Sequence, residues 1–308
     1  MNRRLSDLGE RGLIAALLAR LPEGTVPVGP GLDDAAAWRD HQGRFEVFTC
    51  DAAVEGVHFD PATQSAHEIG WRALALALGD IAAMGARPSY ATITLAAPPE
   101  MESSWLEELY QGLADLSLRC GLEIVGGDTV ASPGPLFLST AILGSAAKIM
   151  RRDTAEEGWY VAITGPLGGP ERRWAEAPQP VPRIAAGQVL ASSGVVCAGD
   201  ISDGLWAELA RISKASGCGF EIEAALVPVV SQPGRDRQAA LDRALAWGEE
   251  VELVCVAPLE ALDTAMGELE GQLQLAVIGR CLADGMRLLA ADGSMMAMPK
   301  GYEHFGGH

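Results

Sequence analysis

Segments rich in β-branched and aromatic residues alternate with segments rich in alanine and leucine through the first half of the chain. The first kind fits the half-buried surface of a sheet, and the second kind has the composition and length of a helix. Helices are expected at 68–86 and 103–120, because a proline at 88 and a glycine at 121 follow them. Strands are expected at 44–51, 89–98, 122–128 and 135–144.

A polar, irregular stretch at 145–158 interrupts this pattern, which then resumes. The resumption predicts two α/β domains, with boundaries 1–146 and 147–308. A stretch rich in proline and charge, 170–182, is expected to be an irregular loop. In the second domain, strands are expected at 159–165, 195–201, 218–223, 252–258 and 275–279, and helices at 183–193, 204–216, 238–248 and 259–271.

The net charge of the chain argues against some classes of binding partner. The chain has 308 residues, 48% of them hydrophobic and 21% charged, with a formal net charge of −18. Nucleic acids and anionic membranes bind clustered Lys and Arg, so neither is expected as a partner. The acidic excess is compatible with cation binding, and equally with plain solubility.

The cysteines and the first residues indicate the compartment. None of the six cysteines forms a C-x-x-C pair and most lie in apolar segments, which is typical of free thiols in a reducing environment. No apolar stretch is long enough to span a bilayer. Acidic residues interrupt the start of the chain, which reads as an amphipathic helix rather than a signal peptide. A cytoplasmic protein is expected.

Aspartates recur among small or apolar residues, most of them where a strand is expected to end. Lys and Arg are scarce around them, although a buried carboxylate needs a partner. Mg²⁺ is the natural partner, since it takes carboxylate oxygens together with water and substrate phosphates. Taken singly, each aspartate could also serve a turn or a cap, as Ser202 or Asp203 could at the start of the helix after 204. The aspartates are Asp33, Asp34, Asp51, Asp80, Asp128, Asp200 and Asp203.

Other signatures of nucleotide and metal sites are absent from the sequence. There is no G-x-x-x-x-G-K-[ST] loop, which excludes a P-loop enzyme. The stretch "GPGLDD" does not fit the dinucleotide-binding pattern, and the five histidines have no zinc-site spacing.

The order of motifs resembles the thiamine-monophosphate kinase family, within the superfamily of aminoimidazole ribonucleotide synthetase and selenophosphate synthetase. The matching stretches run from residue 31 to residue 305 in the family's order, which makes the resemblance specific although each stretch alone is weak. They are "GLDDAAA", "TCDAAVEGVHF", "ALGDIAAMGARP", "VGGDTV", "MRRDTAEEGW", "GDISDGL", "WGEEVEL" and "GYEHF".

The resemblance implies a fold and a set of site residues. An N-terminal α/β domain would form a β-barrel with its twin across a homodimer, and a C-terminal α/β domain would close an ATP groove. Asp51, Asp128, Arg151 and Asp203 would be the catalytic residues. The implied Mg²⁺ ligands are Asp34, Thr49, Cys50 (through its main-chain oxygen), Asp51, Asp80, Asp128, Asp200 and Asp203. The implied ATP contacts are Tyr110, Gly127, Asp128, Arg151 and Ser202, and the implied substrate contacts are His58, Glu249 and Pro299.

The implied reaction is direct transfer of the ATP γ-phosphoryl group to thiamine monophosphate, with Mg²⁺ required. The alternatives are a related ATP-dependent enzyme with another small-molecule acceptor, and a catalytically silent homologue. The first alternative is kept open by departures from the family pattern near the substrate. Trp247, Glu250 and Val251 differ from the family, Pro299 replaces an aromatic residue, and the 170–182 loop is short. Cys50 and Gly79 replace hydroxyl residues near the metal positions.

Overall fold

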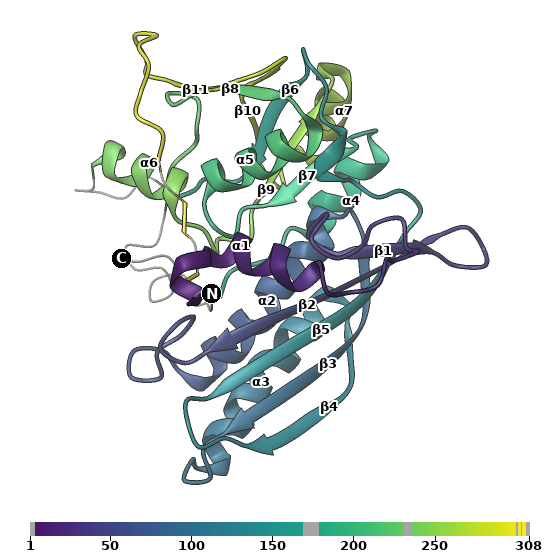
Figure 1. Cartoon of the computed structure of the whole chain (residues 1–308), viewed down its shortest axis with the longest axis vertical. Helices are drawn as coiled ribbons and strands as arrows, with labels where there is room; N and C mark the ends of the chain where they lie inside the picture. The colour runs from purple at the N-terminus through teal and green to yellow at the C-terminus, as the bar shows by residue number, and fades with distance from the viewer. Residues whose placement is uncertain (1–3, 169–178, 231–235, 300, 303, 306–308) are drawn as a thin grey trace.

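The computed structural model describes residues 4–168, 179–230, 236–299, 301–302 and 304–305. Its elements form two sheets, one above the other in Figure 1, with the first half of the chain in the lower sheet. The predicted α/β class is therefore confirmed. Within the described residues, no helix combines the length and apolarity needed to cross a membrane. The boundary between residues 146 and 147 stays a prediction.

The first sheet has the strand order β1-β2-β5-β3-β4. Only β3 and β4 pair in parallel; the other neighbours are antiparallel. The four expected strands of this half are present, and β1 is an addition that was too short to detect from its pattern. The strands are β1 (Ala36–Arg39), β2 (Phe45–Val54), β3 (Arg87–Ala97), β4 (Glu123–Ala131) and β5 (Phe137–Ala146).

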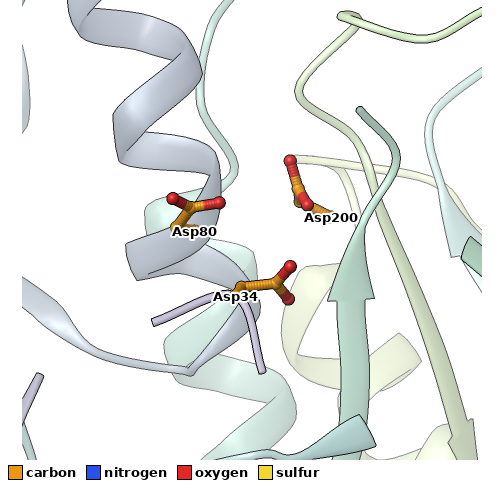
Figure 2. A group of neighbouring side chains, drawn as sticks. All are labelled: Asp34, Asp80 and Asp200. Carbon is orange, nitrogen blue, oxygen red and sulfur yellow. The ribbon is translucent and has the colours of Figure 1, made fainter. Parts of the chain in front are cut away.

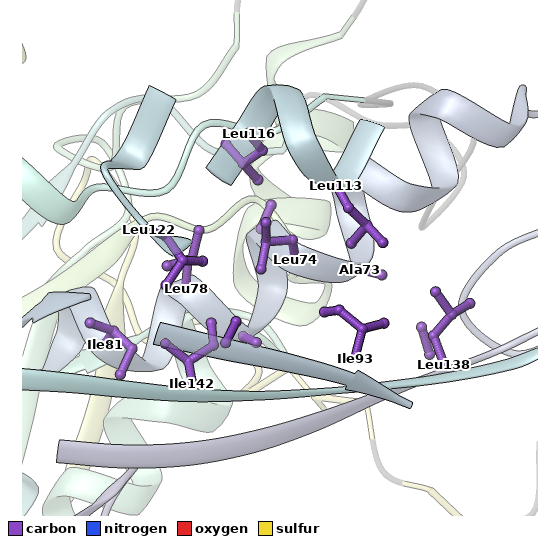
Figure 3. Packing of buried hydrophobic residues seen from close by; sticks show 14 of the residues in the cluster. Ala73, Leu74, Leu78, Ile81, Ile93, Leu113, Leu116, Leu122, Leu138 and Ile142 are labelled. Atoms are coloured by element: carbon purple, nitrogen blue, oxygen red, sulfur yellow. The ribbon is translucent and has the colours of Figure 1, made fainter. Parts of the chain in front are cut away.

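Two long helices, α2 (Ala66–Ala83) and α3 (Ser103–Cys120), cover one face of this sheet. Figure 3 shows leucines of both helices facing isoleucines and leucines of β3 and β5. Ser65 begins α2 with a capping box: its hydroxyl accepts the Glu68 N–H at 3.3 Å, and Glu68 accepts the Ser65 N–H at 2.9 Å. Helix α2 is a rigid support for the candidate site described below.

The second sheet has the order β11-β8-β10-β6-β9-β7. The five expected strands are present, and β11 (Met286–Leu289) is again a short addition. Helix α2 contacts both the first sheet and the second, touching β7 and β9, so it is buried on nearly every side. The other strands are β6 (Tyr160–Thr164), β7 (Cys197–Asp200), β8 (Gly219–Glu223), β9 (Leu253–Ala257) and β10 (Leu275–Leu282).

The remaining helices surround the second sheet or lie at its junction with the first. Helix α1 matches the expected amphipathic first helix, although Gly9 interrupts it with a φ of 64°. The expected 170–182 loop lies mostly outside the described residues. The helices are α1 (Leu5–Leu18), the 3₁₀ turn η1 (Arg152–Thr154), α4 (Ile184–Ser192), α5 (Leu205–Ser216), α6 (Arg237–Ala246) and α7 (Leu259–Leu269).

Candidate functional site

Three aspartates from distant parts of the chain meet between the two sheets. Asp34 lies in the segment before β1, Asp80 lies near the end of α2, and Asp200 is the last residue of β7. One carboxylate oxygen from each lies within 4.8 Å of the others. Figure 2 shows the three carboxylates converging on a common space. This arrangement brings together three of the predicted metal ligands.

The cluster strongly disfavours three negative charges. Burial, together with repulsion from Asp80 and Glu208, raises the pKa of Asp200 to about 8. Burial also raises the pKa values of Asp34 and Asp80 well above the usual range, and neighbouring carboxylates add to both shifts. Opposite charge close to such a group favours its ionised form. A bound cation would therefore favour the ionised forms of these three carboxylates, which burial disfavours.

The donor set fits Mg²⁺. All three clustered groups offer oxygen, the ligand atom that Mg²⁺ prefers. Within the described part of the chain, Asp34 Oδ2 is buried and has no hydrogen-bond partner, so this oxygen remains available for a cation. Thr49, another predicted ligand, is buried on β2 and donates its hydroxyl hydrogen to Asp80 at 2.5 Å.

Cys50 is held differently from its neighbours on β2. Its side chain is exposed, and its sulfur lies 3.2 Å from Ser139 Oγ. Successive side chains of a strand point to opposite faces, so the thiol faces away from buried Thr49. Only the main-chain oxygen of Cys50 suits the metal role that the resemblance implies.

Among the described residues, Arg152 is the cation that reaches the aspartate cluster. Its guanidinium pairs with Asp34 and lies 3.9 Å from Asp200. Its main-chain N–H also donates to Asp33 at 3.0 Å. The sequence pointed to the neighbouring Arg151 instead, but that side chain pairs with Asp153 outside the cluster. The double arginine in "MRRDTA" was the available signal, and it left the choice of arginine open.

The loop 201–204 corrects the proposed capping role. Helix α5 begins after Gly204, which has a φ of 98° and provides no side-chain cap. Neither Ser202 nor Asp203 caps this helix; Asp203 instead forms an ion pair with Arg211 on α5. Both residues line the cavity beside the aspartate cluster. The two aspartates of "GDISDGL" therefore line the cavity and do not cap the helix.

A cavity of about 180 Å³ adjoins the cluster. It brings predicted substrate residues together with predicted metal ligands, as the resemblance requires. Sequence reasoning missed Glu10 and His304, which come from near the two ends of the described chain and are joined by a 3.0 Å bond from the His304 N–H to Glu10. The lining residues are Glu10, Asp51, His58, Leu76, Asp80, Asp200, Ser202, Asp203, Glu249 and His304.

Glu249 is held in an unusual backbone conformation at the wall of this cavity. It has a φ of 64°, and Val251 has a φ of 53°, values that cost free energy for residues with side chains. Arg72 on α2 forms a buried ion pair with Glu249 at 2.5 Å. Val251 is buried in the same hydrophobic core as the first sheet. These contacts fix the loop against α2 despite its strain.

Four more predicted residues, like Asp34, Thr49, Cys50 and Arg151, lie outside the lining of the cavity. Gly127 and Asp128 lie on β4, the exposed edge strand of the first sheet, and Tyr110 is 37% exposed on α3. Pro299 is half-buried near the end of the described chain. Gly127 runs so close to β3 that a Cβ atom would lie 1.8 Å from the Ile93 carbonyl oxygen, which explains its lack of a side chain.

The chain matches known protein families and curated relatives in its sequence. Residues 32–146 match the family model "AIR synthase related protein, N-terminal domain", and residues 127–289 match the corresponding C-terminal domain. A thiamine-monophosphate kinase of Synechococcus elongatus is 35% identical, covering 100% of this chain and 99% of its own. The thiamine-monophosphate kinase of Escherichia coli is 33% identical, covering 96% of this chain and 98% of its own.

The chain is also similar to solved structures. "AaThiL complexed with AMPPCP and TMP" is 26% identical with a TM-score of 0.82, and the match covers 99% of both chains. The hydrogenase maturation protein HypE in complex with ATP has a TM-score of 0.69 at 20% identity, covering 96% of this chain and 93% of its own. The second likeness concerns the fold alone.

Proposed function

We propose a function from the premise that the chain belongs to the thiamine-monophosphate kinase family of AIR synthase related proteins. This membership confirms the resemblance that the sequence motifs indicated, and it makes the chain a member of a phosphotransferase family. The proposed reaction is transfer of the γ-phosphoryl group of ATP to thiamine monophosphate, giving thiamine diphosphate and ADP.

One observation carries the proposal: the aspartate cluster and the acceptor residues share one cavity. Asp80 and Asp200 belong both to the cluster and to the cavity lining. His58 and Glu249 line the same cavity, at the positions that the resemblance assigns to thiamine monophosphate. A donor phosphate at the cluster would therefore lie beside an acceptor phosphate in the cavity, as direct transfer requires.

The chain's own residues would bind and orient the two anionic reactants. We assign the phosphate-binding role to Arg152 in place of Arg151, which the resemblance implies, because Arg152 pairs with Asp34 of the cluster. Ser202 and Asp203 lie just before α5, whose free N–H groups favour phosphate. Gly127, Asp128 and Tyr110 complete the proposed ATP contacts.

Mg²⁺ would be held by the predicted ligands. When bound, it supplies positive charge that offsets the repulsion between the phosphates of the two reactants. The proposed ligands are Asp34, Thr49, Asp51, Asp80, Asp128, Asp200, Asp203 and the main-chain oxygen of Cys50.

The transfer needs no protein nucleophile. An oxygen of the acceptor phosphate forms a bond to the γ-phosphorus as the bond to the ADP oxygen breaks, in line with the attack. The acceptor phosphate is already largely ionised near neutral pH, so no side chain has to remove a proton. Catalysis then rests on positioning and on charge. Six free cysteines suit a reducing compartment, which favours the cytoplasm as the site of this reaction.

A second candidate keeps the same phosphoryl-transfer site with a different small-molecule acceptor. It is favoured by Pro299, which replaces the family's aromatic residue, and by Trp247, which is 37% exposed at the end of α6. Losing one aromatic contact costs about 0.5–1.5 kcal/mol beyond lost burial, or roughly tenfold in affinity at most. Thiamine monophosphate is therefore expected to bind more weakly than in family members with the aromatic residue.

Chromatographic detection of thiamine diphosphate tests the proposal. The purified protein is incubated with ATP, Mg²⁺ and either thiamine monophosphate or a panel of other phosphate-bearing acceptors. Product is expected with thiamine monophosphate, and Asp51→Asn is expected to abolish it while preserving the apo fold, because that change removes a buried like charge. ATP consumption with another acceptor alone would support the second candidate instead.

A further inference from the structure

Glu208 on α5 is a buried carboxylate that the proposed reaction does not use. Its side chain is 0% exposed and is absent from the cavity lining. Oε1 accepts the Arg152 Nε–H at 2.5 Å, and Oε2 accepts a second Arg152 N–H at 3.0 Å. Oε2 also accepts an N–H of Arg211 at 3.0 Å. One carboxylate thus binds two guanidinium groups.

Each of these arginines also forms an ion pair with a proposed metal ligand. Arg152 pairs with Asp34 and lies 3.9 Å from Asp200, whereas Arg211 pairs with Asp203. Glu208 is therefore the shared partner at the centre of a charged network. The network connects the cluster between the sheets with the loop that begins α5.

The backbone of β7 leaves room for this carboxylate. A Cβ atom on Gly199 would lie 2.1 Å from Glu208 Oε1. A side chain at residue 199 would therefore displace the carboxylate from Arg152. The glycine that precedes Asp200 has a packing reason to be a glycine, and that reason is Glu208.

Arg152 pairs with two acids, Glu208 and Asp34, and its position between them affects the aspartate cluster. A two-point contact with a carboxylate fixes the plane and direction of a guanidinium group. Held this way by Glu208, Arg152 donates one further N–H to Asp34 Oδ1 and leaves Asp34 Oδ2 without a hydrogen bond among the described residues. Without Glu208, Arg152 would pair more fully with Asp34 and Asp200. It would then compete with a metal ion for their oxygens.

We propose that Glu208 is a positioning residue that holds Arg152 and Arg211 away from full pairing with the aspartates and so keeps the cluster open to a divalent cation and its nucleotide. The proposal rests on the proposed function only for the identity of the ligand, a complex of Mg²⁺ with a nucleoside triphosphate. It assigns to Glu208 an effect on metal and nucleotide binding, and none on the acceptor.

Glu208→Gln tests the proposal, with Glu252→Gln as the matched control. Glu252 is also a buried glutamate that binds an arginine with both oxygens, but its partners are Arg183 and Thr164 instead of the site arginines. Loss of charge at either position should lower the melting temperature. Only Glu208→Gln is expected to weaken Mg²⁺ binding, by about tenfold, the size of one lost charged hydrogen bond.

Calorimetric titration with Mg²⁺ and AMPPCP provides a readout that needs no turnover. Glu208→Gln should raise the dissociation constant of the complex and the half-saturating Mg²⁺ concentration in the assay, with an unchanged KM for thiamine monophosphate. Equal binding by Glu208→Gln and Glu252→Gln would overturn the proposal. Wild-type protein that binds Mg²⁺ and AMPPCP without forming thiamine diphosphate would refute the proposed function but leave this test valid.

Glu208→Asp keeps the test decisive if Glu208→Gln does not fold. Aspartate retains the charge but is one methylene shorter, so it cannot reach both arginines with the same geometry. Weaker binding of Mg²⁺ and AMPPCP with a near-normal melting temperature is expected. Unchanged binding by Glu208→Asp would show that only the buried charge matters and would contradict a positioning role.

Discussion

Arg151 and Arg152 are adjacent in the chain, but their side chains enter different surroundings. Arg152 is nearly buried and pairs with Asp34, whereas Arg151 is one-third exposed and pairs with Asp153. Arg151, which precedes η1, has extended backbone, and in extended backbone neighbouring side chains point to opposite sides. A motif match fixes the region of the chain, and the backbone direction then decides which arginine reaches the site.

Arg152→Ala should reduce kcat/KM for ATP on the order of 100-fold, because one preorganised charged donor to the transferring phosphate is lost. Arg151→Ala is the control and should stay within about threefold of wild type, as expected for an exposed ion pair. Steady-state kinetics at saturating Mg²⁺ measure both variants. The reverse order of the two effects would restore the assignment to Arg151.

The aspartates could be predicted from the sequence, whereas their partners could not. A carboxylate among small and apolar residues is a local signal, so Asp34, Asp80 and Asp200 were found and do converge. Glu10 and His304 lie about as far apart in the chain as two residues can, and no local pattern indicates that they meet. The capping interpretation of Ser202 failed because Gly204 begins α5 with a positive φ.

At the scale of elements, two glycines set the distance between α2 and α3. A Cβ atom on Gly70 would lie 2.0 Å from the Leu109 carbonyl oxygen, and one on Gly112 would lie 2.0 Å from the His67 carbonyl oxygen. The backbones of the two helices are therefore in direct contact at this crossing. Close packing here holds α2, and with it Asp80 and Arg72, against the sheet.

Gly112→Ala should lower the free energy of unfolding by at least about 1–3 kcal/mol, because the added methyl group forces the helices apart. Gly267→Ala on α7 is the matched control, since a Cβ atom there meets nothing within 4 Å. That control should be stabilising by about 0.5–1 kcal/mol, as expected for glycine replaced within a helix. Urea unfolding measures both changes. Equal stability of the two variants would contradict the close crossing.

Most elements were predicted from the hydrophobic pattern, including the four-residue β7, which follows an apolar run, but β1 and β11 were missed. Helices α2 and α3 each have 18 residues, enough for composition and end signals to identify them. Strands β1 and β11 have 4 residues each, too few for an alternation to stand out. Their strand conformation comes from pairing with β2 and β8, which is information from the tertiary structure.

At the scale of the whole molecule, the acidic site makes stability depend on pH. Burial raises the pKa of Asp33 and Asp51 to about 6 and that of Asp200 to about 8. The unfolded chain has pKa values near 3.9 for these groups, so the folded chain binds more protons between about pH 4 and 8. With EDTA present, the unfolding free energy should therefore fall as the pH rises through this range.

Thermal melting from about pH 5 to 8 checks this linkage. Mg²⁺ should reduce the fall in melting temperature, because a bound cation favours the ionised carboxylates. Asp200→Asn should flatten the profile in EDTA, chiefly above pH 6, because the pKa of Asp200 is about 8 whereas those of Asp33 and Asp51 are about 6. A melting temperature that rises with pH in EDTA would contradict the assignment of these raised pKa values.

The outer face of the first sheet supports the predicted homodimer. Phe48, Leu143 and Tyr90 are register neighbours across β2, β5 and β3. Phe48 is 42% exposed and Tyr90 is 49% exposed, whereas their strand neighbours Val47 and Ala91 are buried, so the two aromatic side chains lie on the face opposite the core. Leu143 between them is half-buried, and a row of apolar residues that are exposed or half-buried on a sheet is typical of an interaction surface.

Light scattering at micromolar concentration should therefore give the mass of a dimer for the wild type. Phe48→Glu should give a monomer, because it places a charge in the apolar row. A fully active wild-type monomer would show that the expected barrel between two copies is not needed.

The aspartate cluster and the adjacent cavity are proposed to carry out one Mg²⁺-dependent phosphoryl transfer. Incubation with thiamine monophosphate and ATP labelled in its γ-phosphate measures this most directly. Labelled thiamine diphosphate is expected, with the label in its terminal phosphate, formed in proportion to bound Mg²⁺ and abolished by EDTA or by Asp80→Asn, which changes a residue of both the cluster and the cavity. Unlabelled thiamine diphosphate, or none at saturating concentrations of both substrates, would contradict it.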